Sequence, residues 1–160
     1  TGERRRLTTL VTKGARTFLP LWDGFPFISP DGRTLAFARQ AKNFNLDLYT
    51  LRLTRDLRSD GEPAKVTDQR YAVVNGLAWT ANGREIVYAA SDSLATSLWR
   101  VPVSGRNTPK RLSYALPAAE YPAIARTPPR LAYTWRVLSR NLWRLDTRTK
   151  ERRMLIATTY

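Results

Sequence analysis

The sequence contains neither cysteine nor histidine. Without cysteine the chain forms no disulfide and offers neither a thiolate ligand nor a cysteine nucleophile. Without histidine it lacks the usual general base and the commonest metal ligand, and a Ser-His-Asp triad cannot be assembled from this chain alone. These two absences exclude several classes of enzyme and metal site before any motif is considered.

Long hydrophobic runs are also missing. No window approaches the roughly 18 apolar residues that a transmembrane helix needs, and the N-terminal TGERRRLTTL lacks the apolar core of a signal peptide. There is no Gly-x-Ser-x-Gly elbow, no Walker A loop and no glycine-rich dinucleotide motif. We therefore expect no catalytic residue, no cofactor and no metal site in this chain.

Acidic residues are scarce beside basic ones. The chain carries 13 Asp and Glu against 27 Lys and Arg, a net charge of +14. Such a balance attracts nucleic acid, anionic membrane surfaces or acidic partners. The cations are mostly scattered singly, and no nucleic-acid-binding motif accompanies the densest runs at 4–6 and 150–153. The pattern favours a solvated basic surface over direct nucleic-acid binding.

The sequence does contain an internal repeat. SPDGRTLAF at 29–37 returns as TANGREIVY at 80–88, and LAY at 131–133 repeats LAF in a third, less regular copy. A leucine-aromatic pair follows each copy, as Leu-Tyr or Leu-Trp, at 48–49, 98–99 and 142–143. The period of roughly 45 to 51 residues is near the blade lengths of propeller repeats.

Each unit contains four short strand candidates. In the first unit they span about 25–28, 34–39, 46–53 and 63–67, and LDLYTLRL alternates with the period of two that strands show. A β-sandwich also has many short strands, but the ordered return of a four-part unit favours a β-propeller. The expected fold is all-β: a partial propeller of four-stranded antiparallel blades, about three blades plus the last strand of a preceding one.

The repeat also sets the expected boundaries. Residues 1–24 are expected to form the end of a preceding blade and a linker, followed by blades at 25–74, 75–120 and 121–160. Closed propellers need about four to eight blades. We therefore expect a fragment of a longer protein or an incomplete ring, completed by further blades or by self-association.

The repeated turn has a physical explanation. Proline at the second position presets a backbone angle, aspartate or asparagine suits the next position, and glycine accepts the left-handed conformation. A hairpin role is therefore favoured over a catalytic or metal-binding role for the aspartate. The third copy has no glycine at 126–129 and must turn differently. The predicted turn residues are Ser29, Pro30, Asp31, Gly32, Asn82 and Gly83.

The recurring aromatic residues are predicted to pack between blades rather than to form a ligand cage. Asp47 and Asp146 both lie beside the recurrent leucine-aromatic strands, but not at equivalent positions of the repeat. We expect them to be exposed strand or turn residues rather than a carboxylate pair. A ligand cage, the alternative, would be formed by Trp79, Trp99, Trp135 and Trp143. The predicted packing residues are Phe37, Tyr49, Tyr88, Trp99, Tyr133 and Trp143.

These motifs resemble the TolB-type propeller repeat, a WD-like repeat common in bacteria. Pro26 and the run from 29 to 37 match its hallmark closely, although the aromatic before Ser-Pro is displaced to Phe27. The resemblance extends from about residue 25 to residue 156 and implies a β-propeller fold. The segment SLWRVPVSG further resembles the sequences of a subgroup in which the propeller is fused to a ToxR/CadC-type winged-helix regulator.

The resemblance implies a non-catalytic module that recognises a protein or a small ligand through propeller loops. In the subgroup it would be the sensory part of a bacterial transcriptional regulator or signalling protein. DNA would then be contacted by an upstream domain rather than by this chain. The alternatives are the propeller of a prolyl-oligopeptidase-type serine peptidase and a TolB-like periplasmic interaction protein. The sequence does not fix the compartment.

Overall fold

The computed structural model describes residues 4, 6–8, 22–40, 45–68, 73–91, 95–104, 108–137 and 140–158. Within these residues the chain contains β-strands and turns but no helix. In the same part of the chain, therefore, no helix is present that could cross a membrane. The all-β class expected from the repeat is confirmed.

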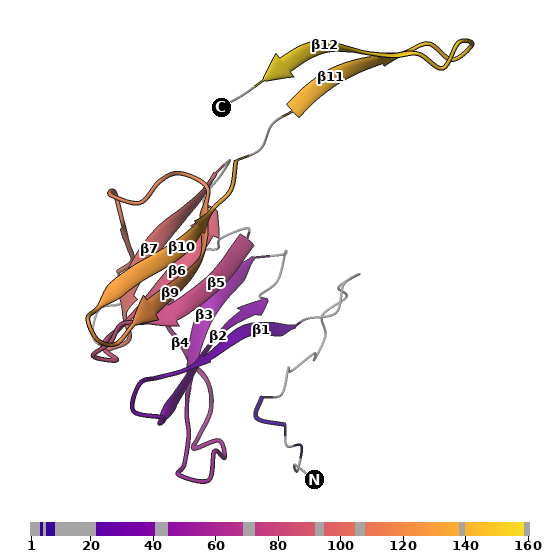
Figure 1. Ribbon diagram of the computed structural model, residues 1–160. Helices are drawn as coiled ribbons and strands as arrows, with labels where there is room; N and C mark the ends of the chain where they lie inside the picture. The colour runs from indigo at the N-terminus through magenta and orange to yellow at the C-terminus, as the bar shows by residue number, and fades with distance from the viewer. Residues whose placement is uncertain are drawn as a thin grey trace.

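The first two repeat units form two similar four-stranded antiparallel sheets, each with its strands in sequence order (Figure 1). In both sheets the second and third strands pair in the same register, with Phe37 opposite Tyr49 and Tyr88 opposite Trp99. The first sheet contains β1 (Asp23–Ile28), β2 (Thr34–Gln40), β3 (Leu46–Arg52) and β4 (Ala64–Lys65). The second contains β5 (Val73–Trp79), β6 (Glu85–Ser91), β7 (Thr96–Pro102) and β8 (Lys110–Arg111).

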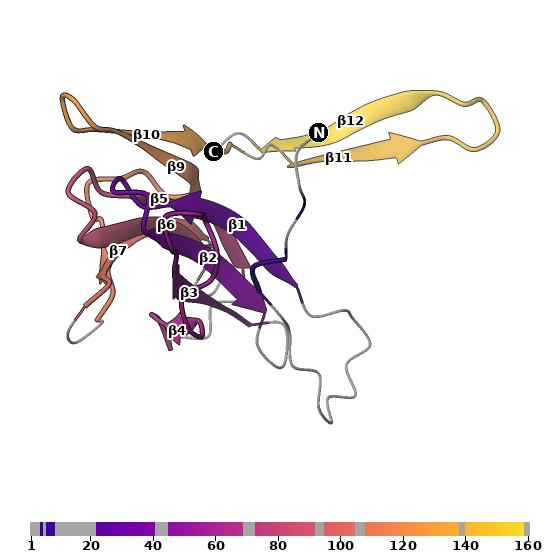
Figure 2. The same ribbon diagram turned by 90° about the horizontal axis from the view of Figure 1, so that it is seen from below.

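The third unit supplies four strands, but they form two separate two-stranded sheets rather than one four-stranded sheet. One sheet pairs β9 (Ala119–Ala125) with β10 (Arg130–Trp135) and lies against the second sheet. The other is a hairpin of β11 (Arg140–Leu145) and β12 (Arg152–Thr158). It extends away from the sheets in both views (Figures 1 and 2).

Alternating side chains build two layers of core between the sheets. Ala36, Leu48 and Val66 of the first unit pack against Tyr88 and Val101 of the second, and all five are buried. On its other face the second sheet presents a further set to β9 and β10. That second cluster contains Val87, Ala89, Leu98, Leu112, Ala119, Ile124, Leu131 and Tyr133. The period-two pattern therefore sends both faces of the second sheet into contacts with neighbouring units.

The first strand of each unit contains a bulge that the sequence did not indicate. Residues at equivalent repeat positions have positive φ angles: Phe25 at 53°, Gly76 at 85° and Tyr121 at 50°. The register of β1, β5 and β9 shifts there, and each strand begins two residues before the expected boundary. The backbone geometry therefore repeats even where the residue types, Phe, Gly and Tyr, do not.

The expected boundary at residue 24 falls inside β1, which begins at Asp23. Most of the segment 1–24 lies outside the described residues, so its assignment to a preceding blade stays a prediction. Of the described part, Leu7 packs against a buried cluster on the face of the first sheet that is turned away from the second sheet. That cluster contains Leu35, Phe37, Leu51 and Leu53.

Candidate functional site

The first repeated turn is held by a small hydrogen-bond network. The Ser29 hydroxyl donates to Asp31 Oδ1 at 2.5 Å and accepts from the Thr34 amide at 2.9 Å. Asp31 Oδ1 also accepts from the Arg33 amide at 3.0 Å. These bonds, with that from Ser29 first, hold the pKa of the Asp31 carboxyl below its ordinary value. Gly32 has a φ of 74°, the left-handed conformation that closes the turn.

The second turn reproduces this network with a neutral amide. The Thr80 hydroxyl donates to Asn82 Oδ1 at 2.8 Å, and the Arg84 amide donates to the same oxygen at 3.0 Å. Gly83 has a φ of 67°. Because asparagine makes the bonds that Asp31 makes in the first turn, an acceptor oxygen suffices and a negative charge is not required.

The third turn, at 126–129, closes β9 and β10 without a glycine. Arg130 pairs with Ala125 in the first register position of the hairpin. The irregular turn expected at this place is therefore present, and it puts Arg126 and Arg130 at the two ends of the loop.

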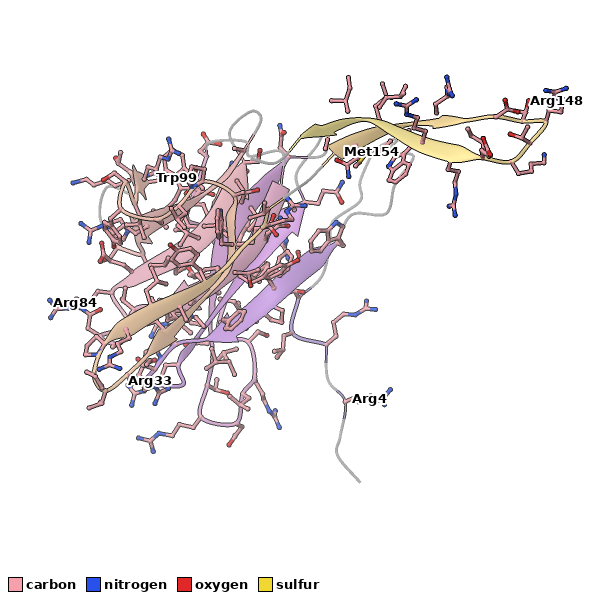
Figure 3. All side chains as sticks on the ribbon, turned by 45° about the horizontal axis from the view of Figure 1, so that its top comes forward. Arg4, Arg33, Arg84, Trp99, Arg148 and Met154 are labelled. Carbon is pink, nitrogen blue, oxygen red and sulfur yellow. The ribbon has the colours of Figure 1, made fainter. Side chains whose placement is uncertain are left out.

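The three turns lie side by side at one end of the sheets. A Cβ added to Gly83 would lie 3.5 Å from the Pro30 ring, so the first two turns are close neighbours. The second and third turns share a groove, whose walls include Thr80, Ala81 and Pro129. We call the surface formed by 29–33, 80–84 and 126–130 the turn rim. Figure 3 shows Arg33 and Arg84 projecting from this end of the molecule.

The turn rim is strongly basic. Arg33, Arg84, Arg126 and Arg130 are all exposed, and among the described residues no ion pair involves their guanidinium groups. Asp31 is the only acidic residue in the three turns, and its carboxylate is occupied by the turn itself. The rim therefore presents four arginines against one carboxylate, that of Asp31. Glu85 borders the adjoining groove, where it lies 3.9 Å from Arg100.

The opposite ends of the strands differ, because the charges there are paired. Arg39 binds both carboxylate oxygens of Asp23, at 2.7 and 2.8 Å. Glu120 is buried and accepts from Arg136 at 2.6 Å and from the Asn75 amide group at 2.9 Å. Such satisfied groups orient and rigidify the inner strands and leave little charge for a ligand.

One sequence expectation is wrong at Asp47, which was expected to be exposed. Its side chain is only 1% exposed. It lies 3.1 Å from Lys65 Nζ and accepts a hydrogen bond from the Thr67 hydroxyl at 3.2 Å. β4 and the residues directly after it bring both partners against β3, so the buried carboxylate is compensated. Asp146 is exposed as expected and caps the hairpin turn by accepting from the amides of Arg148 and Thr149.

The groove between the second sheet and the β9–β10 hairpin has a volume of about 210 Å³. Its apolar lining includes Val87, Leu112, Ile124 and Leu131, and Arg100 also borders it. The volume is below the roughly 300–1,000 Å³ of typical drug-sized ligand sites. The groove therefore suits one or two side chains better than a cofactor.

The predicted packing residues occupy different environments. Phe37 and Tyr88 are almost completely buried. Tyr49, half-buried, stacks on Phe37 with ring centroids 5.9 Å apart, and the Arg39 guanidinium lies 5.2 Å from each ring centroid. Trp99 and Tyr133 are half-buried against the two cores. The packing role of Trp143 stays a prediction, because its side chain is 56% exposed.

Within the described residues, no group of three or more Asp and Glu side chains is arranged to hold a metal ion. The buried carboxylates of Asp47 and Glu120 each have a basic partner instead. The arginines of the turn rim form a candidate site that sequence reasoning missed. A signal for two of them was present, since Arg33 and Arg84 each follow the turn glycine at equivalent repeat positions.

Comparison with solved structures identifies the architecture. The chain superposes on TolB from Acinetobacter baumannii with a TM-score of 0.56 and 18% identity, covering 86% of this chain and 33% of that one. A protein assigned as TolB from Agrobacterium tumefaciens gives a TM-score of 0.56 and 17% identity, with 88% and 50% covered. No protein-family model matches the sequence, and no curated protein matches it.

The chain has a TolB-type β-propeller fold. The expectation of a partial propeller is confirmed, and the sandwich alternative is not needed. At these identities the likeness concerns the fold. The chain spans only about a third to a half of the length of these two proteins.

Proposed function

We propose that this chain is a non-catalytic recognition module that binds an acidic polypeptide segment at the turn rim. The observation that carries the proposal is the grouping, on three adjacent turns, of four exposed arginines that form no ion pair within the described part of the chain. Internal hydrogen bonds hold the first two turns in place at the ends of their strands. A preorganised surface loses little conformational entropy when a partner binds.

The chemistry of the rim favours carboxylates. All four cations are arginines, whose planar guanidinium can bind both oxygens of a carboxylate or phosphate at once. Arg33 and Arg84 occupy equivalent places in consecutive units, so an extended partner crossing the rim meets arginine at each unit. Rim charges of this kind mainly raise the association rate and confer specificity for partners of opposite charge.

A polypeptide fits better than a nucleic acid. Proteins that bind single strands combine a basic track with aromatic platforms for the bases, and the three turns contain no aromatic residue. The carboxylate of Asp31 also interrupts the basic track and would repel a continuous phosphate backbone. A protein partner can place its carboxylates opposite the arginines and avoid Asp31.

We infer further that the module belongs to a longer bacterial regulatory or signalling protein. The resemblance of SLWRVPVSG to a winged-helix regulator subgroup supports this role. The likeness to TolB structures favours a second candidate, a TolB-like interaction protein. The complete reading frame distinguishes them: an encoded winged-helix or kinase domain supports the regulator, and a secretory signal without such a domain supports the second candidate.

The binding proposal is tested with a fluorescein-labelled, glutamate-rich peptide followed by fluorescence anisotropy. The test variant carries Arg33→Glu, Arg84→Glu and Arg130→Glu. The matched control carries Arg4→Glu, Arg6→Glu and Arg148→Glu, which are exposed and have the same net effect on charge. Arg4 and Arg148 lie far from the rim (Figure 3). A lysine-rich peptide serves as the negative control. A single-stranded oligonucleotide with the same negative charge as the acidic peptide serves as the competing probe.

We expect the rim variant to lose at least tenfold in affinity for the acidic peptide while the control variant loses much less. Affinity should fall with ionic strength, since the contacts are exposed. Equal losses in both variants would show that only net charge matters and would contradict a defined site. Tighter binding of the oligonucleotide through the same three arginines would replace the proposal with a nucleic-acid role.

A further inference from the structure

The β11–β12 hairpin carries apolar side chains that nothing covers within the described residues. They line both faces of the hairpin, with exposed fractions from 45% to 56%. A two-stranded hairpin without a packing partner is marginally stable in water. The residues concerned are Leu142, Trp143, Leu145, Met154, Leu155 and Ile156.

The β9–β10 sheet has one edge, along β10, that lacks a paired strand within the described residues. β2 and β6 each pair with a following strand, but β10 pairs only with β9, so its outer edge is free within the described chain. Ala132 and Thr134 of β10 are exposed. A free sheet edge presents unpaired backbone groups to any strand that can reach it.

The repeat fixes how β11 would fit this edge. The first sheet pairs Phe37 with Tyr49 and Leu35 with Leu51. The second pairs Tyr88 with Trp99 and Ile86 with Val101. The same register in the third unit places Trp143 opposite Tyr133, and Leu145 opposite Leu131.

This register also fills the groove described above. Leu131 lines the groove, and a paired β11 would bring Leu145 beside it on the same face of the sheet. Val101, at the position equivalent to Leu145, is fully buried between the first two sheets. Leu145 is instead 54% exposed on the hairpin. An apolar groove and an apolar strand thus match in position and in chemistry.

The connection between β10 and β11 disfavours pairing within one chain. In the shared register, five residues link the paired ends of β2 and β3, and four link those of β6 and β7. The third unit would leave only Val137, Leu138 and Ser139. Three-residue hairpin loops need a residue in the left-handed conformation, and none of the three is Gly, Asn or Asp. Short connections of this kind favour exchange between copies.

We propose that the β11–β12 hairpin of one copy pairs with the β10 edge of a second copy, and the reverse. Each copy thereby supplies the third and fourth strands of its partner's third blade, in a symmetric exchanged dimer. The partner's Leu145 enters the groove, which is incomplete without it. The inference is independent of peptide binding at the turn rim. Because both copies carry a net charge of +14, dimerisation should strengthen with ionic strength.

The absence of cysteine gives a clean background for testing this pairing by disulfide formation. Thr134→Cys and Leu142→Cys are made in separate, differently tagged copies, and the copies are mixed, unfolded together and refolded. The proposed register places these positions directly opposite each other. The Cα atoms of opposed residues in an antiparallel pair lie about 4.5–5.5 Å apart, within the Cα–Cα range that a disulfide spans. Thr134→Cys mixed with Lys150→Cys is the out-of-register control.

We expect a dimer by sedimentation, and efficient crosslinking of Thr134→Cys to Leu142→Cys between the two tags with little crosslinking in the control. A monomer at all concentrations would overturn the proposal. So would a chain carrying both cysteines whose disulfide forms only within itself, because β11 would then close on its own β10.

A second variant tests the role of the short connection. Inserting Asn-Gly between Leu138 and Ser139 supplies the residues that a tight hairpin loop prefers. We expect this variant to sediment as a monomer and to form the disulfide between positions 134 and 142 within one chain. An insertion variant that dimerises as strongly as the parent would contradict the argument. Acidic-peptide affinity of the monomeric variant reports separately on the turn rim.

Discussion

The indole Nε1 of Trp79 donates a hydrogen bond of 3.0 Å to the backbone carbonyl oxygen of Phe27. Trp79 ends β5 of the second sheet, and Phe27 lies in β1 of the first. The Trp79 side chain is only 7% exposed and belongs to the core between the two sheets. This tryptophan therefore joins two repeat units just behind the turn rim and is not a free ligand-binding ring.

Replacing Trp79 by phenylalanine should destabilise the fold. The substitution removes the hydrogen bond to Phe27 and leaves a small void, with a combined cost of about 1–2 kcal/mol. Trp135→Phe is the matched control, since Trp135 is 55% exposed and should change stability by less than about 0.5 kcal/mol. Chemical denaturation of both variants measures the difference. Equal stability of the two would contradict the joining role of Trp79.

Two glycines with positive φ should differ in their tolerance of alanine. Gly32 has open space around it, so Gly32→Ala carries only the backbone cost of the left-handed conformation, about 1 kcal/mol. At Gly76 an added Cβ would also lie 2.9 Å from the Tyr121 Cα atom, where β5 meets β9. We expect Gly76→Ala to cost more than about 2 kcal/mol. Thermal unfolding of the two variants checks this order, and the reverse order would refute it.

Replacing Asp31 by asparagine should change little. Asn82 makes the same pair of hydrogen bonds in the second turn, so the amide oxygen introduced by Asp31→Asn can replace the carboxylate. We expect an unchanged melting temperature and slightly stronger binding of the acidic peptide, because the variant removes the one negative charge of the rim. Loss of peptide binding would reveal a functional role for this carboxylate beyond the turn.

The pair of Asp23 and Arg39 should make stability depend on pH in the acidic range. Burial acts to raise the pKa of the Asp23 carboxyl, but hydrogen bonds from Arg39 and Thr8 and the Arg39 charge outweigh it. They hold that pKa below its ordinary value of 3.8. A carboxyl whose pKa is lowered by folding stabilises the fold above its unfolded-state pKa and loses this effect as the pH falls through its folded-state pKa.

We therefore expect Asp23→Asn to be less stable than the parent at neutral pH, by about 1 kcal/mol after allowance for partial exposure of the pair. The difference should shrink as the pH falls below about 4. Urea unfolding of both proteins between pH about 7 and about 3 measures it. A difference that does not vary with pH would mean that the pair contributes through shape rather than through charge.

Much of the fold is predictable from sequence because its signals are local. The turns at 29–33 and 80–84 follow from the preferences of proline, aspartate and glycine. The strands of the first two sheets follow from alternation and from the repeat. The shared pairing register, such as Phe37 opposite Tyr49, then follows because equivalent turns fix equivalent registers.

The features that escaped prediction depend on contacts between distant segments. Asp47 is buried because β4 and the residues directly after it bring Lys65 and Thr67 against it, which no local pattern encodes. The bulges at Phe25 and Tyr121 use residues that rarely adopt positive φ, so the surrounding sheets must impose them. The basic rim depends on the three turns being neighbours, which sequence spacing alone does not establish.

Binding at the turn rim should be visible in the hydrogen exchange of the backbone amides, measured with and without the acidic peptide. We expect slower exchange confined to 29–33, 80–84 and 126–130, with no change at the paired charges of Asp23 and Glu120. Protection spread evenly over the basic surface, or confined to the β11–β12 hairpin, would contradict it.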